Sequence, residues 1–362
     1  MLIPRKFALL CLLLVGATSA HASQRLSLPQ ALAAAFAQNP ELAATRREIG
    51  IADGEWRQAR LLPNPELAWE VEDTRRETST TTITLSQPLE LGGKRAARIA
   101  AAGVGQAIAQ LDLERQRNGL RADVVQAFHA ALRAQTALEL AQQSQALTAR
   151  GLRVVQGRVT AGQSSPVEAT RAQVQLAQAE ALLRRAQTQR SVAYQALARL
   201  TGSPLASFDT LQAAKLSPGA APSTNTLLAH VEQTVEWRLA AAQVERGDAA
   251  LGTEKAQRIP NLTVSLGSQY SREDRERVNV LGLSMPLPLF DRNQGNVLAA
   301  ARRADQARDL RNAVELRLRS ESRSALSQWD TAMQAWVRKR PCAFPTSPSA
   351  WVASTAARIA SG

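Results

Sequence analysis

The chain has few of the residues that catalysis, metal thiolates or disulfides require. Its 362 residues include two cysteines and three histidines, and aromatic residues make up 4% of it. Cys11 lies in an N-terminal apolar run that resembles an export signal, so cleavage would leave only Cys342. One cysteine excludes an intrachain disulfide and a zinc or iron–sulfur site built on thiolates. The scarcity of aromatics also argues against base-stacking surfaces.

The remaining reactive groups form no recognisable constellation. His129 and His230 have no His, Cys or carboxylate cluster beside them at the spacing of metal ligands. No Ser/His/Asp, Cys/His or phosphate-loop arrangement is present. The net charge of +13 would suit nucleic acid, but the export signal favours a solvated basic face on Arg-rich helices. We therefore predict no catalysis, cofactor, bound metal or nucleic-acid partner.

Residues 1–22 have the pattern of a secretory signal. Arg5 and Lys6 precede an apolar run over 7–17, and Ala20-His21-Ala22 supplies the small residues of a cleavage site. The run is too short to cross a bilayer, so we expect it to be removed. A lipid anchor on Cys11 is disfavoured because Leu10, rather than a small residue, precedes it.

Two motifs occur twice in the same order. Leu62-Pro63-Asn64-Pro65 returns as Ile259-Pro260-Asn261, and 85–89 (LSQPL) returns as 283–287 (LSMPL). Pro63 and Pro260 are 197 positions apart, and Pro88 and Pro286 are 198 apart. This spacing predicts an internal duplication. We expect a first repeat over 23–200, a linker over 201–225, a second repeat over 226–336 and a tail over 337–362.

Each repeat is predicted to contain helices followed by a β-hairpin. Capping signals predict helices over 28–38 and 40–62, and the prolines of the repeated motif end the second. Apolar and polar residues then alternate over about 66–88 and again over about 261–287, each time around a charged loop. Strands of this length could cross a membrane or form a soluble sheet with one wet face, and alternation alone does not decide between them.

A long helical hairpin follows the first strand pair. Residues 93–156 contain no proline and repeat apolar residues at helical spacing, which predicts a rod of about 100 Å at 1.5 Å per residue. Ser165, Pro166 and Glu168 supply an N-cap, a first-turn proline and a capping-box acid for a returning helix to about Leu200. Residues 159–164 are therefore expected to form the tip of an antiparallel hairpin.

Together these features resemble the TolC-like outer-membrane efflux proteins, in particular the cobalt-zinc-cadmium resistance branch. The resemblance lies in 85–95 (LSQPLELGGKR) at the strand-to-helix junction and 157–168 (GRVTAGQSSPVE) at the hairpin tip, and extends over about 26–336. It implies a mainly α fold with membrane β-structure, in which long helical hairpins form a periplasmic tunnel. Four strands from each of three chains would form a twelve-stranded barrel in outer-membrane lipid.

The resemblance also implies partners and a passive function. A homotrimer would act with a periplasmic adaptor and an inner-membrane pump of the resistance-nodulation-division type, to export heavy-metal cations or other small toxic solutes. Val159, Thr160, Ala161 and Gly162 match the adaptor-docking tip, although a simple tight turn would use the same residues. Glu70 and Glu72 would face the lumen, where they would either be merely solvated or favour cations.

The repeats differ at two places. Thr234-Val235-Glu236-Trp237 replaces Asn39-Pro40-Glu41-Leu42, so a helix break is expected to be missing in the second copy. After about Trp336 the helical pattern gives way to a proline-containing segment, where the duplication requires a second tip and returning helix. Our hypothesis is a truncation, for example by a frameshift, that would impair channel assembly.

Two other classes of protein stay open at the level of sequence. A periplasmic adaptor also combines a signal with a helical hairpin, but it should carry one hairpin within a lipoyl-like β domain rather than two strand pairs. A soluble periplasmic coiled-coil scaffold would leave Trp69, Ile83, Leu266 and Leu283 without lipid to face. Migration on gels before and after heating, and solubility without detergent, would distinguish these classes.

Overall fold

The computed structural model describes residues 25–203, 208–213 and 221–339. Its contacts divide the chain into two compact units, Met1–Ala43 with Arg117–Lys215, and Ala44–Gln116 with Leu216–Gly362. These units cut across the two sequence repeats, because the helices α2 (Pro40–Ala59) and α3 (Lys94–Thr160) each contribute to both units. The predicted signal over 1–22 and the segment after Lys339 lie outside the described residues.

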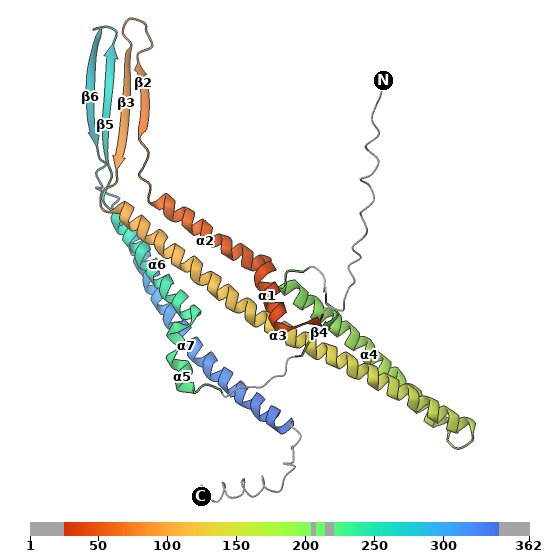
Figure 1. The fold of residues 1–362 in the computed structure, drawn as a ribbon. Helices are drawn as coiled ribbons and strands as arrows, with labels where there is room; N and C mark the ends of the chain where they lie inside the picture. The colour runs from red at the N-terminus through yellow and green to blue at the C-terminus, as the bar shows by residue number, and fades with distance from the viewer. Residues whose placement is uncertain (1–24, 204–207, 214–220, 340–362) are drawn as a thin grey trace, which may run out of the picture. The chain divides into compact units, whose positions relative to one another are not determined.

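The helices of the first repeat form close to where the sequence predicts them (Figure 1). They are α1 (Leu28–Gln38), α2 (Pro40–Ala59), α3 (Lys94–Thr160) and α4 (Pro166–Leu200). Helix α3 has 67 residues, somewhat more than the expected rod. Helix α2 ends before the predicted residue 62, since the prolines at 63 and 65 disfavour helical conformation in the residues that precede them.

The first unit is held together around the α1–α2 turn. Phe128, Leu42 and Leu197 are fully buried side chains of this unit. Asn39 is also buried, and its two side-chain groups are both used: Oδ1 accepts from the Leu42 N–H at 3.0 Å, and Nδ2 donates to the Leu200 carbonyl at 3.1 Å. This asparagine therefore caps α2 and ties its start to the end of α4. The short parallel pair of β1 (Arg25–Leu26) with β4 (Thr210–Leu211) was not expected from the sequence.

The expectation that the second repeat lacks a helix break is wrong. Helix α5 (Thr224–Ala229) and a 3₁₀ turn, Val231–Gln233, precede α6 (Val235–Gln257), so the chain does break here. Thr234 caps α6, with its Oγ1 accepting from the Trp237 N–H at 3.4 Å. A threonine thus performs the capping that the first repeat assigns to Asn39, because either side chain offers an oxygen to the free N–H groups of a helix start.

In the second unit, α6 packs against α7 (Gln294–Lys339). Gly247 permits this approach: a Cβ on it would lie 3.0 Å from the Ala304 Cα. Arg308 donates to Asp248 at 2.6 Å across the same pair of helices. Among the residues that the structure describes, none of the helices combines the length and apolar character of a membrane span.

The second unit also contains a four-stranded sheet in the order β2-β3-β5-β6, with every pair antiparallel (Figure 1). Its strands are β2 (Glu66–Glu72), β3 (Thr80–Leu89), β5 (Leu262–Ser271) and β6 (Glu276–Ser284). Both predicted hairpins are therefore present, and the pairing of β3 with β5 joins the two repeats. Strands β2 and β6 are the edges.

Candidate channel-forming sheet and hairpin tip

The sheet has one apolar face that the described residues of this chain leave uncovered. Residues directly opposite each other in an antiparallel pair share a face, so the register assigns every strand residue to one of two faces. Leu67, Trp69, Leu281 and Leu283 lie on one face and are 74%, 71%, 72% and 69% exposed. The same face carries Ile83, Leu85, Val264, Leu266 and Tyr270. An apolar face of this extent requires a partner or a lipid environment.

The opposite face is polar and acidic. It carries four carboxylates, those of Glu66, Glu70, Glu72 and Glu276, and no lysine or arginine; Arg277 of β6 lies on the apolar face, opposite Tyr270. Its other residues are mainly threonine, serine, glycine and glutamine. The structure thus places Glu70 and Glu72 together on the polar face. The prediction omitted Glu66 and Glu276. Glu66 could have been found from its alternation with Leu67 and Trp69, whereas Glu276, followed by Arg277 and sharing its face with Val278, reads as part of the charged loop.

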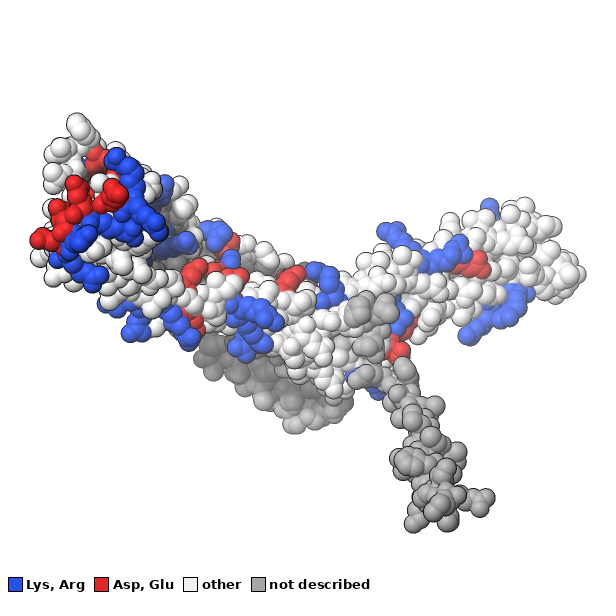
Figure 2. Space-filling model, turned by 90° about the horizontal axis from the view of Figure 1, so that it is seen from above, with Lys and Arg blue, Asp and Glu red and all other residues white. Residues whose placement is uncertain are grey.

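The loop ends of the strands are charged as well. In the β2–β3 loop, Arg75 donates to Asp73 at 2.7 Å, and this interaction, with help from Thr78, lowers the pKa of Asp73 to about 2. In the β5–β6 loop, Ser271 donates to Asp274 at 2.9 Å. Acidic and basic side chains lie beside one another at this end of the sheet (Figure 2). The loops are therefore polar surfaces with locally compensated charge.

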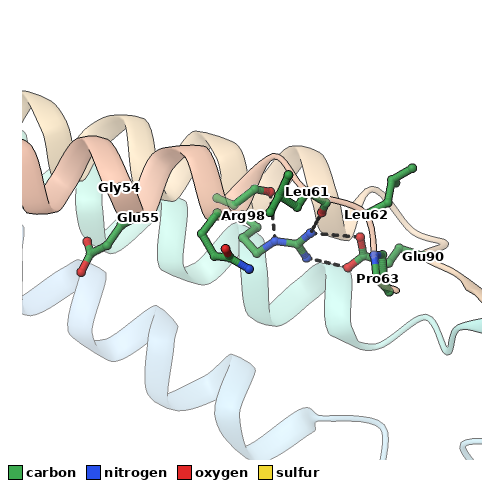
Figure 3. Close-up of a pocket in the computed structure, with 9 residues that line it drawn as sticks. Gly54, Glu55, Leu61, Leu62, Pro63, Glu90 and Arg98 are labelled. Carbon is green, nitrogen blue, oxygen red and sulfur yellow. Dashed lines mark hydrogen bonds and ion pairs between the residues drawn. The ribbon is translucent and has the colours of Figure 1, made fainter. Parts of the chain in front are cut away.

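A partly buried ion pair fixes the junction between β3 and α3. Arg98 donates two hydrogen bonds to Glu90, at 2.5 and 3.0 Å, and also donates to the carbonyls of Ala59 and Leu61 at 3.1 Å each (Figure 3). The Glu90 side chain is only 9% exposed. The Arg98 hydrogen bonds lower the pKa of Glu90 below its ordinary value. One guanidinium thus joins the end of α2, the strand exit and the start of α3.

The hairpin tip ends α3 with a Schellman motif. Gly162 has φ +71°, the Gly162 N–H donates to the Val159 carbonyl at 3.0 Å, and the Gln163 N–H donates to the Arg158 carbonyl at 2.8 Å. Ser165 then caps α4, since its Oγ accepts from the Val167 N–H at 3.3 Å. Both helix ends are therefore capped by bonds within the turn itself.

The four predicted docking residues lie at this turn. Thr160, Ala161 and Gly162 are exposed, and Val159 is half-buried. The Thr160 hydroxyl donates to the Gln156 carbonyl at 2.6 Å, which leaves its methyl group as part of the surface. Residues 159–164 carry no charged side chain, and the tip forms a region without blue or red atoms (Figure 2). Such a tip offers a small, uncharged surface with accessible backbone.

His129 and His230 make local contacts. His129 makes an edge-on contact with Phe128, with ring centroids 5.8 Å apart. His230 Nδ1 lies 2.6 Å from the Thr226 carbonyl. Within the described ranges no group of three or more His, Cys, Asp or Glu side chains is arranged to hold a metal ion.

These features define an outer-membrane channel protein, and comparison with known sequences agrees. The chain matches the outer membrane efflux protein family over residues 31–203 and 235–336, and it belongs to that family. The family is one of efflux channels, not enzymes, and the chain is an outer-membrane component of an efflux system. The adaptor and scaffold alternatives are therefore not favoured.

Two relatives and one solved structure illustrate the similarity. The cobalt-zinc-cadmium resistance protein CzcC of Cupriavidus metallidurans is 39% identical over 298 residues, which cover 82% of this chain and 71% of CzcC. The nickel-cobalt-cadmium resistance protein NccC of Alcaligenes xylosoxydans xylosoxydans is 26% identical, with 88% and 73% covered. The outer membrane protein VceC of Vibrio cholerae has the same fold, with a TM-score of 0.67, 19% identity, and 86% and 80% covered.

Proposed function

We propose that three copies of this chain form a passive channel for heavy-metal cations. The observation that carries the proposal is the distribution of charge on the sheet: four carboxylates and no basic residue occupy its polar face, although the chain as a whole has a net charge of +13. If the polar face lines a pore, a trimer repeats these carboxylates three times around it. Acidic side chains in a pore attract cations and exclude anions.

The apolar face supports placing the same strands in the membrane. Trp69 and the leucines around it would face lipid, where their exposed area costs no hydration energy. Backbone groups at an open sheet edge cannot be left unpaired in hydrocarbon, so a four-stranded sheet must share a closed barrel with other strands. Three copies would supply twelve strands.

The cargo is inferred from relatives as well as from charge. CzcC and NccC are named for resistance to cobalt, zinc, cadmium and nickel. Divalent cations pass most easily where carboxylates offset their loss of hydration without binding them tightly. Isolated glutamates on alternate strand positions meet this condition better than a closed cluster of ligands. The energy for efflux would come from another protein, an inner-membrane pump of the resistance-nodulation-division type.

A periplasmic adaptor would dock at the hairpin tip. Small, uncharged residues at Val159, Thr160, Ala161 and Gly162 allow another helical hairpin to approach the backbone closely. The local satisfaction of both helix ends supports this role, because the turn needs no contact from its partner to keep its shape.

Light scattering and bilayer conductance test the channel. Protein extracted from the outer membrane should have the mass of a trimer in detergent. In planar bilayers with a zinc chloride gradient, the sign of the reversal potential should show that the channel prefers cations to chloride. Changing Glu70 and Glu72 together to glutamine should reduce that preference severalfold. Glu77→Gln, which removes a loop carboxylate instead, is the matched control. An unchanged reversal potential in the double variant would remove the assigned role of these residues.

Photo-crosslinking tests the docking tip. A photoreactive amino acid at Ala161 should capture a periplasmic protein in cells, whereas the same probe at exposed Gln178 on α4 should not. Ala161→Trp should block efflux without changing the mass of the trimer. Equal capture from both positions would contradict docking at the tip.

A further inference from the structure

The sheet ends in two open edges that lie on different repeats. Strand β2 belongs to the first repeat and β6 to the second, and each pairs on one side only. All seven residues of β2 are exposed, as are eight of the nine in β6. Unpaired edge strands with apolar side chains are templates for pairing with another chain.

The two hairpins have the same internal register. Adding 197 to a β2 position and 198 to a β3 position converts the first hairpin into the second. Trp69 pairs with Ile83, and the converted pair, Leu266 with Leu281, is observed. Glu66 with Ser86 likewise becomes Thr263 with Ser284, which is also observed. The duplication is therefore preserved residue by residue in the strand pairing.

The same conversion can be applied to the strand pair that joins the repeats. Within the chain, β3 pairs with β5, with Ser86 opposite Ser265 and Leu85 opposite Leu266. We propose that β6 of one copy pairs with β2 of the next in the converted register, which places Ser284 opposite Ala68 and Leu283 opposite Trp69 of the neighbouring copy. This proposal rests on the trimeric channel proposed above and specifies its interface.

The side chains fit this register. Leu283 and Trp69 both belong to the apolar face, and Ser284 and Ala68 both belong to the polar face, so both faces continue across the boundary. A shift of one residue would place leucines beside glutamates. The register also sets Glu70 opposite Gly282, where a residue without a side chain leaves room for the carboxylate. The corresponding pair inside the chain, Thr84 with Gly267, also contains one glycine.

The junctions below the strands provide a second, separate correspondence. Inside the chain, Lys94 donates to Asn261 at 2.6 Å. Conversion gives Arg292 and Asn64 of the next copy, again a cation and an amide, and both are exposed in the single chain. The contact of Gly92 with Ile259 converts to Phe290 and Leu62, which are 90% and 68% exposed. A neighbouring copy would cover this otherwise exposed phenylalanine.

The backbone of the second junction differs from that of the first. Asn293 takes a positive φ of 56°, whereas the first junction uses Gly92 and Gly93. The junction residues therefore indicate which side chains face each other, and the strand register alone fixes the pairing. A second copy is the occupant because the chain carries both halves of the contact, one on each edge.

Disulfide trapping tests the register. In a background with Cys11→Ser and Cys342→Ser, the full-length pair Ser284→Cys with Ala68→Cys should link separate chains on mild oxidation. The expected readout is a ladder of dimers and trimers on non-reducing gels that collapses on reduction. Ser284→Cys with Glu66→Cys lies on the same face two positions away and is the matched control. Ser86→Cys with Ser265→Cys should link within one chain, because the two hydroxyl oxygens are 2.9 Å apart.

The outcomes separate the interface from the function. A ladder from Ser284/Ala68 at least fivefold stronger than from Ser284/Glu66 supports the register. A stronger ladder from the control pair, or none from either when light scattering finds a trimer, overturns the register and leaves the channel intact. Monomeric protein in which Ser86/Ser265 still links overturns the trimer itself.

Discussion

Replacing Gly92 by alanine tests how closely the β3–α3 junction packs against the end of α6. Gly92 and Gly93 are adjacent and have almost the same backbone conformation, with φ of +70° and +73°. Their surroundings differ. A Cβ on Gly92 would lie 2.7 Å from the Ile259 Cβ and 3.1 Å from the Ala256 carbonyl oxygen, whereas a Cβ on Gly93 meets no atom within 4 Å.

This pair separates backbone strain from steric overlap. An alanine in the left-handed region costs about 1–2 kcal/mol, and this cost applies to both positions. Overpacking adds about 1–3 kcal/mol where the surroundings must move, and this applies only to Gly92. We therefore expect Gly93→Ala to lower the free energy of unfolding by about 1–2 kcal/mol and Gly92→Ala by about 2–5 kcal/mol.

Equilibrium urea unfolding in detergent, followed by tryptophan fluorescence, measures both variants. The double variant Gly92→Ala with Ile259→Ala removes the Ile259 Cδ1, 2.8 Å from the added methyl group, but keeps the Ile259 Cβ at 2.7 Å, so it should recover only part of the overlap and should lose somewhat less stability than the two single changes added together. Equal losses for Gly92→Ala and Gly93→Ala would refute the argument, because they would mean that the close approach to Ile259 carries no free energy.

Other expectations concern the ion pair, the tip and the helix caps. Arg98→Ala should cost about 2–3 kcal/mol because Glu90 stays buried without its donor. Folding lowers the pKa of Glu90, so the Glu90 carboxylate stabilises the protein at pH values above its pKa in the unfolded chain. This stabilisation is lost as the pH falls through the pKa of the folded state, and Glu90→Gln should therefore make the free energy of unfolding less dependent on pH in this range. Gly162→Ala, strained but unhindered, should cost about 1 kcal/mol in urea unfolding, and a larger loss would indicate a hidden contact. Asn39→Ala should cost about 2 kcal/mol and Thr234→Ala about 1 kcal/mol, since only Asn39 also bonds another helix; equal losses would exclude the Leu200 contact.

Local signals in the sequence predict most of the elements. The Ser165-Pro166 start of α4 and the alternation around Trp69 depend on neighbours within a few residues, so they can be recognised without tertiary information. The same holds for Glu70 and Glu72, whose face follows from the period of two. The duplication predicted that two similar hairpins would occur at a fixed separation.

The failures have a common physical cause. The sequence did not predict the break before α6 because the two repeats use different residues for the same cap: Thr234 caps α6, as Asn39 caps α2. The capping role of Asn39 follows from its place before Pro40, but its bond to the last residue of α4 and the role of Arg98 could not be foreseen. Both depend on groups that only folding brings together, since Arg98 reaches the end of α2. Contacts between residues far apart in the chain produce no repeating pattern in the sequence.

The sequence by itself determined the repeated helix–hairpin–helix plan, the tip and the two-faced strands, since these follow from local conformation and from the alternation of apolar and polar residues. Only the tertiary structure decided that β3 pairs with β5, and in which register, because strand pairing is a choice between segments distant in the chain. That choice gathers four carboxylates on one face and leaves β2 and β6 as open edges.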